Sequence, residues 1–218
     1  MRTLIVGDVH GCLDELKDIV DSFGLVLGKD RIFQTGDMIN RGPHSLGSLE
    51  FARECGIQSV LGNHESRLIQ IWETPAHARN PKEDAFLKRL GGNLEHIYEL
   101  VKNWPLWIDD RDFTLVHAGI QPGKSSLEDM DRKVLLTVRT WDGVGKDLDS
   151  PKDPPWFSCV KWPRTVVFGH WALGGLVVQP GFRGLDSGCV YGKSLSAWCP
   201  EEDRIYQVAA RHEYSRLH

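Results

Sequence analysis

Polar side chains that could bind metal ions lie in five short segments of the sequence, each directly after a short apolar run. Together the segments supply carboxylate, amide and imidazole groups, a mixture that suits manganese, iron or zinc and contains too much nitrogen for calcium. The adjacent glycines allow the backbone to turn sharply and to approach a metal closely. The segments are Gly7-Asp8-Val9-His10-Gly11, Gly36-Asp37, Gly62-Asn63-His64-Glu65, His117-Ala118-Gly119 and Gly169-His170.

One such segment is weak evidence, because a lone Gly-His or Asp-x-His is more often a turn or a satisfied polar contact. Here, however, four of the nine histidines fall in such segments, each just past an apolar run. If these runs are strands, their carboxyl ends would gather the side chains into one crevice. The spacing therefore predicts a single metal site built from distant parts of the chain.

The first half of the sequence alternates apolar runs with amphipathic segments, which is typical of parallel βαβ units. Within residues 12–23, for example, Leu13, Leu16, Ile19 and Phe23 recur at helical spacing. We expect strands at residues 3–6, 31–35 and 57–61, and helices at 12–23, 45–55 and about 65–72. Each of the first three polar segments then lies at the end of a strand.

Residues from about 75 to 104 interrupt this alternation. Prolines and the Gly91-Gly92 pair separate what we expect to be short helices, and residues 93–102 are amphipathic. We favour a helical, lid-like insertion here over a simple connecting helix pair. Beyond Pro105 we expect strands at 106–108, 113–116, 165–168, 195–198 and 204–208, with a surface loop at 143–155. The second half is therefore expected to form a second sheet packed on the first.

Length and composition indicate one ordinary globular domain spanning residues 1–218. Lys and Arg total 26 against 30 Asp and Glu, a net charge of −4, so an anionic substrate must be attracted by local charge or by metal. The apolar stretch Leu4-Ile5-Val6 is too short for a signal peptide, and no run reaches the length of a membrane span. Five cysteines without zinc-like pairs indicate reduced thiols. We expect a cytoplasmic protein with no membrane contact and no stable protein partner.

Taken together, the five segments resemble the phosphoprotein-phosphatase branch of the metallophosphoesterases, over nearly the whole chain from Asp8 to about Val208. The resemblance implies an α/β fold, a four-layer α-β-β-α sandwich of two mixed sheets flanked by helices. It also implies a first metal held by Asp8, His10 and Asp37, and a second metal that shares Asp37. Asn63, His117 and His170 would complete the second metal site.

The same resemblance assigns roles to residues beside the expected metals. It makes His64 the general acid and Arg41 a phosphate clamp, and it makes Arg139, on fewer flanking residues, a second phosphate-binding arginine. Two divalent cations that share a carboxylate lower the pKa of a bridging water and generate hydroxide for attack on phosphorus. Guanidinium groups bind the remaining oxygens, and a histidine beside a metal ligand can protonate the leaving oxygen. We expect manganese, with iron, zinc, cobalt or magnesium as alternatives.

Two subfamilies compete for the substrate: symmetrical diadenosine-tetraphosphate hydrolases and serine/threonine protein phosphatases. The segments Val167-Phe168-Gly169-His170-Trp171-Ala172 and Leu185-Asp186-Ser187-Gly188-Cys189 are similar to the hydrolases, although the chain is shorter after His117 than their long form. We therefore expect symmetrical hydrolysis of diadenosine tetraphosphate to two ADP. Capped RNA ends and phosphoproteins are alternative substrates, and a non-catalytic metal-binding scaffold is a remote alternative.

One departure from the family pattern bears on this choice. The pattern Gly-Asp-x-x-Asp-Arg-Gly here reads Gly36-Asp37-Met38-Ile39-Asn40-Arg41-Gly42, so the aspartate that normally pairs with the general acid is Asn40. Asn40 can orient His64 but brings no charge to favour its imidazolium form. A serine alkoxide, whose conjugate acid has a pKa near that of water at roughly 16, needs strong protonation. A phosphate leaving group, with a last pKa of roughly 6, needs little.

The sequence says less about the rest of the substrate. A purine could stack on one of the second-half tryptophans, although core packing is the commoner use of such residues. Four basic residues of the expected insertion could bind distal phosphates or could simply form a solvated helix face. The candidates are Trp141, Trp156, Trp162 and Trp171 for the base, and Arg79, Lys82, Lys88 and Arg89 for the phosphates.

Overall fold

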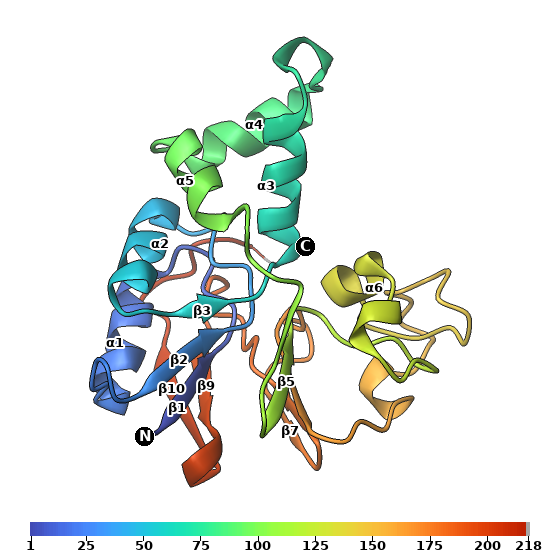
Figure 1. Ribbon diagram of the computed structural model, residues 1–218. Helices are drawn as coiled ribbons and strands as arrows, with labels where there is room; N and C mark the ends of the chain where they lie inside the picture. The colour runs from blue at the N-terminus through green and yellow to red at the C-terminus, as the bar shows by residue number, and fades with distance from the viewer. Residues whose placement is uncertain (217–218) are drawn as a thin grey trace.

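Two five-stranded mixed sheets lie at the centre of the computed structural model, which describes residues 1–216 (Figure 1). The first sheet has the strand order β10-β9-β1-β2-β3. Strands β1, β2 and β3 are parallel, as the βαβ pattern predicted, while β9 and β10 form an antiparallel hairpin along the other edge of β1. The strands are β1 (Thr3–Val6), β2 (Arg31–Gln34), β3 (Gln58–Ser59), β9 (Ser194–Cys199) and β10 (Arg204–Ala209).

The second sheet has the order β4-β5-β6-β8-β7 and is parallel at its centre, where β5, β6 and β8 lie side by side. Its two edge strands run antiparallel to their neighbours. The strands are β4 (Trp107–Asp109), β5 (Phe113–Val116), β6 (Thr165–Phe168), β7 (Val177–Gln179) and β8 (Phe182–Gly184).

The expectation that every later strand belongs to the second sheet was wrong for two strands. Strands β9 and β10 join the first sheet, where Trp198 pairs with Ile5 of β1. They cover the edge of β1 that β2 leaves open, and their contacts are too distant in sequence for local pattern to reveal. The strands β7 and β8 were not predicted at all.

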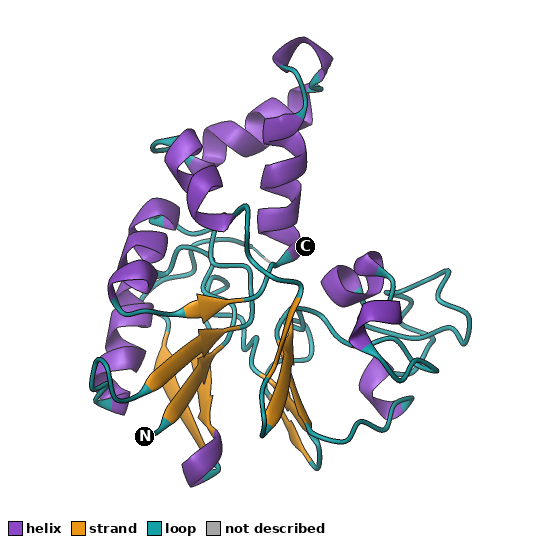
Figure 2. Ribbon diagram, in the orientation of Figure 1, coloured by secondary structure: helices purple, strands orange, loops and turns teal. Residues whose placement is uncertain are grey.

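Helices cover the outer face of each sheet, so the layers are helix, sheet, sheet, helix, and the expected four-layer α/β sandwich is confirmed (Figure 2). Side chains of β1 alternate between the two faces of the sheet, and both faces are covered. Leu4 and Val6 lie in the core beneath the helices, whereas Ile5 lies in the core between the sheets. The helices are α1 (Leu13–Phe23), α2 (Ser45–Glu54), α3 (Asn63–Glu73), α4 (Pro81–Leu90), α5 (Leu94–Val101) and α6 (Arg132–Thr137). Short 3-10 turns occupy Ala76–Ala78, Leu127–Asp129, Trp156–Ser158 and Pro200–Glu202.

The segment expected as an insertion contains α4 and α5, which stand with α3 above the sheets in Figure 1. Its inner face is apolar: Phe86, Ile97 and Val101 are fully buried and continue the core of the first sheet. Residues 143–155 form no strand or helix, as expected for a surface loop. Within residues 1–216, no helix combines the length and the apolar character that crossing a membrane requires.

Candidate functional site

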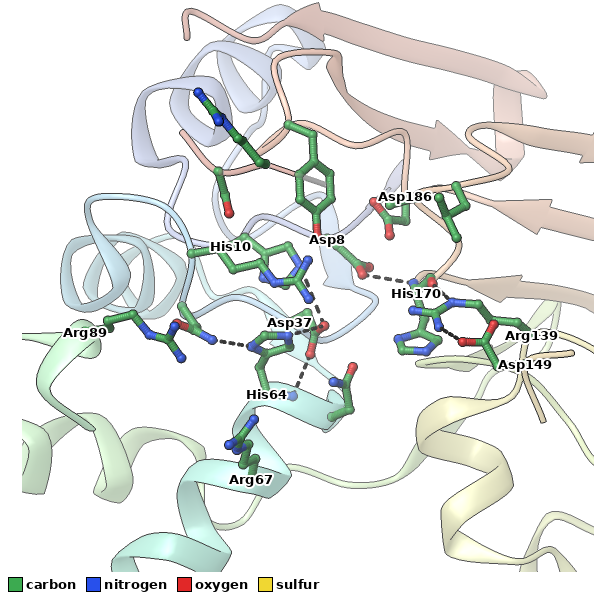
Figure 3. A pocket seen from close by; sticks show the side chains of 18 residues that line it. Asp8, His10, Asp37, His64, Arg67, Arg89, Arg139, Asp149, His170 and Asp186 are labelled. Carbon is green, nitrogen blue, oxygen red and sulfur yellow. Dashed lines mark hydrogen bonds and ion pairs between the residues drawn. The ribbon is translucent and has the colours of Figure 1, made fainter. Parts of the chain in front are cut away.

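The polar segments at the strand ends meet in one cavity of about 490 Å³, shown in Figure 3. The loops after β1, β2 and β6 and the first turn of α3 contribute its walls. Of the six expected metal ligands, five line the cavity, and the sixth, His117, is fully buried behind Asp37. The five lining ligands are Asp8, His10, Asp37, Asn63 and His170.

Asp37 lies at the centre of the group. Its Oδ2 atom is 3.7 Å from His10 Nε2 and 3.6 Å from His117 Nε2. Two clusters of potential ligand atoms, each within 4.8 Å, share this residue: one adds His10 and His64, and the other adds His117 and His170. A carboxylate common to two such clusters fits a ligand that bridges two cations. Asp8 lines the same cavity without belonging to either cluster.

Hydrogen bonds from the backbone orient the imidazoles as metal ligands require. His117 Nδ1 lies 2.8 Å from the carbonyl of Thr35, and His10 Nδ1 lies 3.1 Å from that of Ile39. Each Nδ1 therefore carries the proton, because a carbonyl can only accept, and Nε2 is left as a lone pair. His117 Nε2 then faces Asn63 Oδ1, also an acceptor, at 2.9 Å. A cation bound by both atoms would relieve this contact, so the donor set fits a divalent metal.

Burial sets the electrostatics of the site. It is the largest cause that raises the pKa of Asp37 to about 7 and the pKa of Asp8 well above its ordinary value. Burial also lowers the pKa of His10 to about 3 and, with nearby positive groups, lowers the pKa of His170. The imidazoles are therefore neutral, and the carboxylates repel one another until a cation joins them.

The backbone at the site is strained. His10, Asp37, Asn40, Arg41 and His170 all have positive φ, between 49° and 72°, although none is a glycine. Such conformations cost of order 1–3 kcal/mol each and persist where surrounding contacts enforce them. Close packing around the strained residues requires glycine at two positions. A Cβ on Gly62 would come within 2.2 Å of the Asp37 amide nitrogen, and one on Gly169 would overlap the Asp8 carboxylate.

Glu65 had no assigned role in the sequence analysis, yet it organises the site. Its buried carboxylate accepts hydrogen bonds from the amides of Asp37 (2.9 Å), Ile39 (3.1 Å) and Gly62 (3.1 Å). These bonds connect the loop after β2 to the start of α3. Burial raises the pKa of Glu65 to about 7. In the sequence, the position of Glu65 directly after His64 was the only indication that it belongs to the site.

Asp186 was also missed as a site residue. It is buried, lines the cavity and lies two residues after β8. Burial raises the pKa of its carboxyl group. It is another polar residue just past a strand end, and it escaped notice because β8 itself was not predicted.

The expected catalytic residues lie within or beside these clusters of possible ligand atoms. The side-chain amide of Asn40 lies 2.7 Å from His64 Nδ1, and His64 Nε2 lies 3.8 Å from Asp37 Oδ2. The guanidinium of Arg41 stacks on Tyr191, 5.3 Å from the ring centre, and lines the cavity. Arg139 also lines the cavity, where it donates to the His170 carbonyl and pairs with Asp149 at 2.6 Å (Figure 3).

The residues proposed to bind the distal parts of a substrate fall into two groups, those that line the cavity and those that do not. Of the four basic residues proposed for the distal phosphates, only Arg89 lines the cavity. Arg67 of α3, which sequence reasoning did not single out, lines it too. Arg79 instead donates to three backbone carbonyls at the end of α3, those of Ile71, Trp72 and Thr74. None of the four second-half tryptophans lines the cavity, and all four pack in or against the core of the second sheet.

Comparison with known proteins gives the same family as the sequence motifs. The symmetrical bis(5'-nucleosyl)-tetraphosphatases of Aromatoleum aromaticum and Psychromonas ingrahamii are 28% and 27% identical to the chain. The first alignment covers 96% of this chain and 97% of the relative, and the second covers 100% and 99%.

Solved structures agree on the fold. A crystal structure of a proposed diadenosine tetraphosphatase superposes with a TM-score of 0.83 at 30% identity, over 96% of this chain and 93% of the other. A serine/threonine phosphatase from Saccharomyces cerevisiae shares the fold alone, with a TM-score of 0.56 at 16% identity over 97% and 80% of the two chains. Because residues 1–193, most of the chain, also match the calcineurin-like phosphoesterase family, the chain belongs to that family.

Proposed function

We propose that this protein is a dinuclear-metal phosphohydrolase that splits diadenosine tetraphosphate symmetrically into two ADP. The observation that carries the proposal is that two groups of possible ligand atoms share Asp37, in a cavity also lined by Asp8 and by arginines. The choice of substrate is supported by the relatives named as symmetrical bis(5'-nucleosyl)-tetraphosphatases, which align with nearly the whole chain.

In this proposal Asp8, His10 and Asp37 hold the first metal, and Asp37, Asn63, His117 and His170 hold the second. The oxygen and nitrogen donors suit manganese, the metal we propose. When bound, the two cations would supply a strong nucleophile from water near neutral pH and polarise the phosphoryl oxygens.

The chain's own residues would then position the substrate. Arg41 and Arg139 bind non-bridging oxygens of the phosphoryl group under attack, because a planar guanidinium can donate two parallel hydrogen bonds. Arg139 is held for this task by the His170 carbonyl and by Asp149.

His64 would deliver the proton to the leaving oxygen. Donation from the Asn40 amide to Nδ1 leaves the imidazole proton on Nε2, the atom that faces Asp37. Burial, His10 and Arg41 lower the pKa of His64 well below its ordinary value, so the acid is a neutral imidazole. A neutral imidazole is a weak acid, which suits a phosphate leaving group better than an alkoxide.

Product analysis on a substrate panel tests the proposal. The panel is diadenosine tetraphosphate, capped RNA, a phosphopeptide and inorganic polyphosphate, each with manganese. We expect diadenosine tetraphosphate to be the fastest and to yield ADP alone, whereas asymmetrical cleavage would yield AMP and ATP. Faster turnover of phosphopeptides would favour the protein phosphatase alternative, and the absence of metal-stimulated turnover of any substrate, including an aryl phosphate, would favour a binding scaffold.

His64→Asn provides the internal test of mechanism. This change should reduce aryl-phosphate and phosphoserine cleavage more than diadenosine tetraphosphate cleavage, because ADP leaves as a stabilised anion that needs little protonation. An equal loss on all three substrates would contradict the assignment of His64 as the proton donor.

A further inference from the structure

We infer that Arg67 and Arg89 form a subsite for the phosphates of the leaving nucleotide, on the His64 side of the cavity. This inference rests on the proposed function and adds to it a reason why a substrate with a phosphate chain is preferred over a simple phosphomonoester. Neither residue belongs to the motifs that define the metal site.

Both side chains lie where a leaving group would extend. Arg67 follows His64 by three residues on α3, so the two side chains share one face of the helix. Arg89 reaches the same cavity from the last turn of α4. Figure 3 shows both residues on the far side of Asp37 from Arg139. The cavity therefore has arginines on both sides of Asp37.

The two guanidinium groups are free to bind an anion. Across residues 1–216, no hydrogen bond or ion pair engages Arg67 or Arg89, and both side chains are exposed. Arg67 is nevertheless anchored, because its guanidinium stacks 4.9 Å above the ring of Phe86, which is fully buried. Stacking uses the face of the guanidinium and leaves its N–H donors available. Arg79 and Arg139, in contrast, already donate to protein groups.

The position of His64 determines which part of a substrate would meet these arginines. An in-line displacement sends the leaving oxygen away from the nucleophile, toward the group that protonates it. Groups attached beyond that oxygen must then pass Arg67 and Arg89. In diadenosine tetraphosphate these groups are the two phosphates of the departing ADP, which guanidiniums bind well. In an aryl phosphate they are an uncharged ring.

Charge removal at each arginine tests the subsite. We expect Arg67→Gln and Arg89→Gln each to lower kcat/KM for diadenosine tetraphosphate about tenfold or more, as the loss of a charge-assisted hydrogen bond implies. The kcat/KM for an aryl phosphate should stay within twofold. Lys88→Gln is the matched control, because Lys88 is an exposed neighbour of Arg89 on α4 that does not line the cavity. It should leave both reactions unchanged.

A second readout separates the subsite from the choice of substrate. ADP should inhibit aryl-phosphate hydrolysis more strongly than AMP at fixed free manganese, and both arginine variants should abolish that difference. If the wild type fails to cleave diadenosine tetraphosphate but shows this pattern, the proposed function fails and the subsite stands. Unchanged diadenosine tetraphosphate kinetics in both variants, or an equal loss on both substrates in Arg89→Gln, would overturn the subsite. Across residues 1–216, no aromatic ring lies against the Arg89 guanidinium as Phe86 does against that of Arg67, so the Arg89 variant keeps the test valid if Arg67→Gln destabilises the fold.

Discussion

Replacing Asn40 with aspartate should favour the imidazolium form of His64, which is a better proton donor than the neutral imidazole. The amide nitrogen of Asn40 lies 2.7 Å from His64 Nδ1, so a carboxylate at this position would accept the Nδ1 proton and face an imidazolium. The wild-type pair can share only a neutral hydrogen bond. The substitution keeps the shape of the side chain and changes its charge.

The size of the effect follows from the geometry. Charge centres about 4 Å apart attract by about 4 kcal/mol at an effective dielectric constant of about 20, equivalent to about 3 pK units for His64. Asn40 is only 5% exposed, so desolvation of the new carboxylate cancels part of this attraction. We therefore expect the pKa of His64 to rise by at least one unit. The rate for poor leaving groups should rise about tenfold relative to that for anhydrides.

A series of aryl and alkyl phosphates with graded leaving-group pKa measures this effect directly. In Asn40→Asp, log kcat/KM should depend less steeply on leaving-group pKa than in the wild type, and phosphoserine activity should rise relative to diadenosine tetraphosphate activity. Asn40→Ala, which removes the hydrogen bond without adding charge, is the control and should make the dependence steeper. An unchanged slope in Asn40→Asp would refute the reasoning that connects this asparagine to substrate choice.

Three further predictions concern the metals and the phosphate clamp. Chelator-treated protein should be inactive and should recover activity with manganese; full activity in excess chelator would contradict a two-metal site. Asp37→Asn should reduce activity more than any other single ligand change, because only this carboxylate belongs to both clusters. Arg41→Ala should raise KM and lower kcat together, measured by steady-state kinetics, and an effect below about threefold on kcat/KM would make Arg41 structural. Burial raises the pKa of Asp37 to about 7, so protons should compete with the metal below that pH. The apparent manganese affinity measured by calorimetry should therefore fall as the pH is lowered from 8 to 6. An affinity that does not change with pH would contradict the raised pKa.

The sequence could place most of the candidate metal ligands in one cavity because they follow strands with a clear apolar pattern. β1, β5 and β6 have core positions that local periodicity reveals, and Asp8, His117 and His170 then lie at strand ends by simple counting. Asp186 was missed for the converse reason. The strands β7 and β8 are only three residues long, and β7 is largely exposed, so neither carries a recognisable pattern.

Features that depend on contacts between distant residues could not be predicted. The pairing of β9 with β1 joins residues nearly two hundred positions apart, and no local pattern distinguishes it from pairing with β6. Basic residues on helices are equally ambiguous in the sequence. Arg79 and Arg89 lie only ten residues apart, yet the first binds backbone carbonyls at the end of α3 and the second lines the cavity.

The Glu65 carboxylate connects helix α3 rigidly to the loop after β2. It clamps three amides from the two segments, so a shift of the helix must carry Asp37 with it. The same helix bears Asn63, His64 and Arg67 within its first two turns. Binding at one end of the helix should therefore affect the other: an anion held at Arg67 would restrict the movement of Asp37. Exchange of α3 between relatives would likewise transfer the recognition of the leaving group together with the alignment of the proton donor.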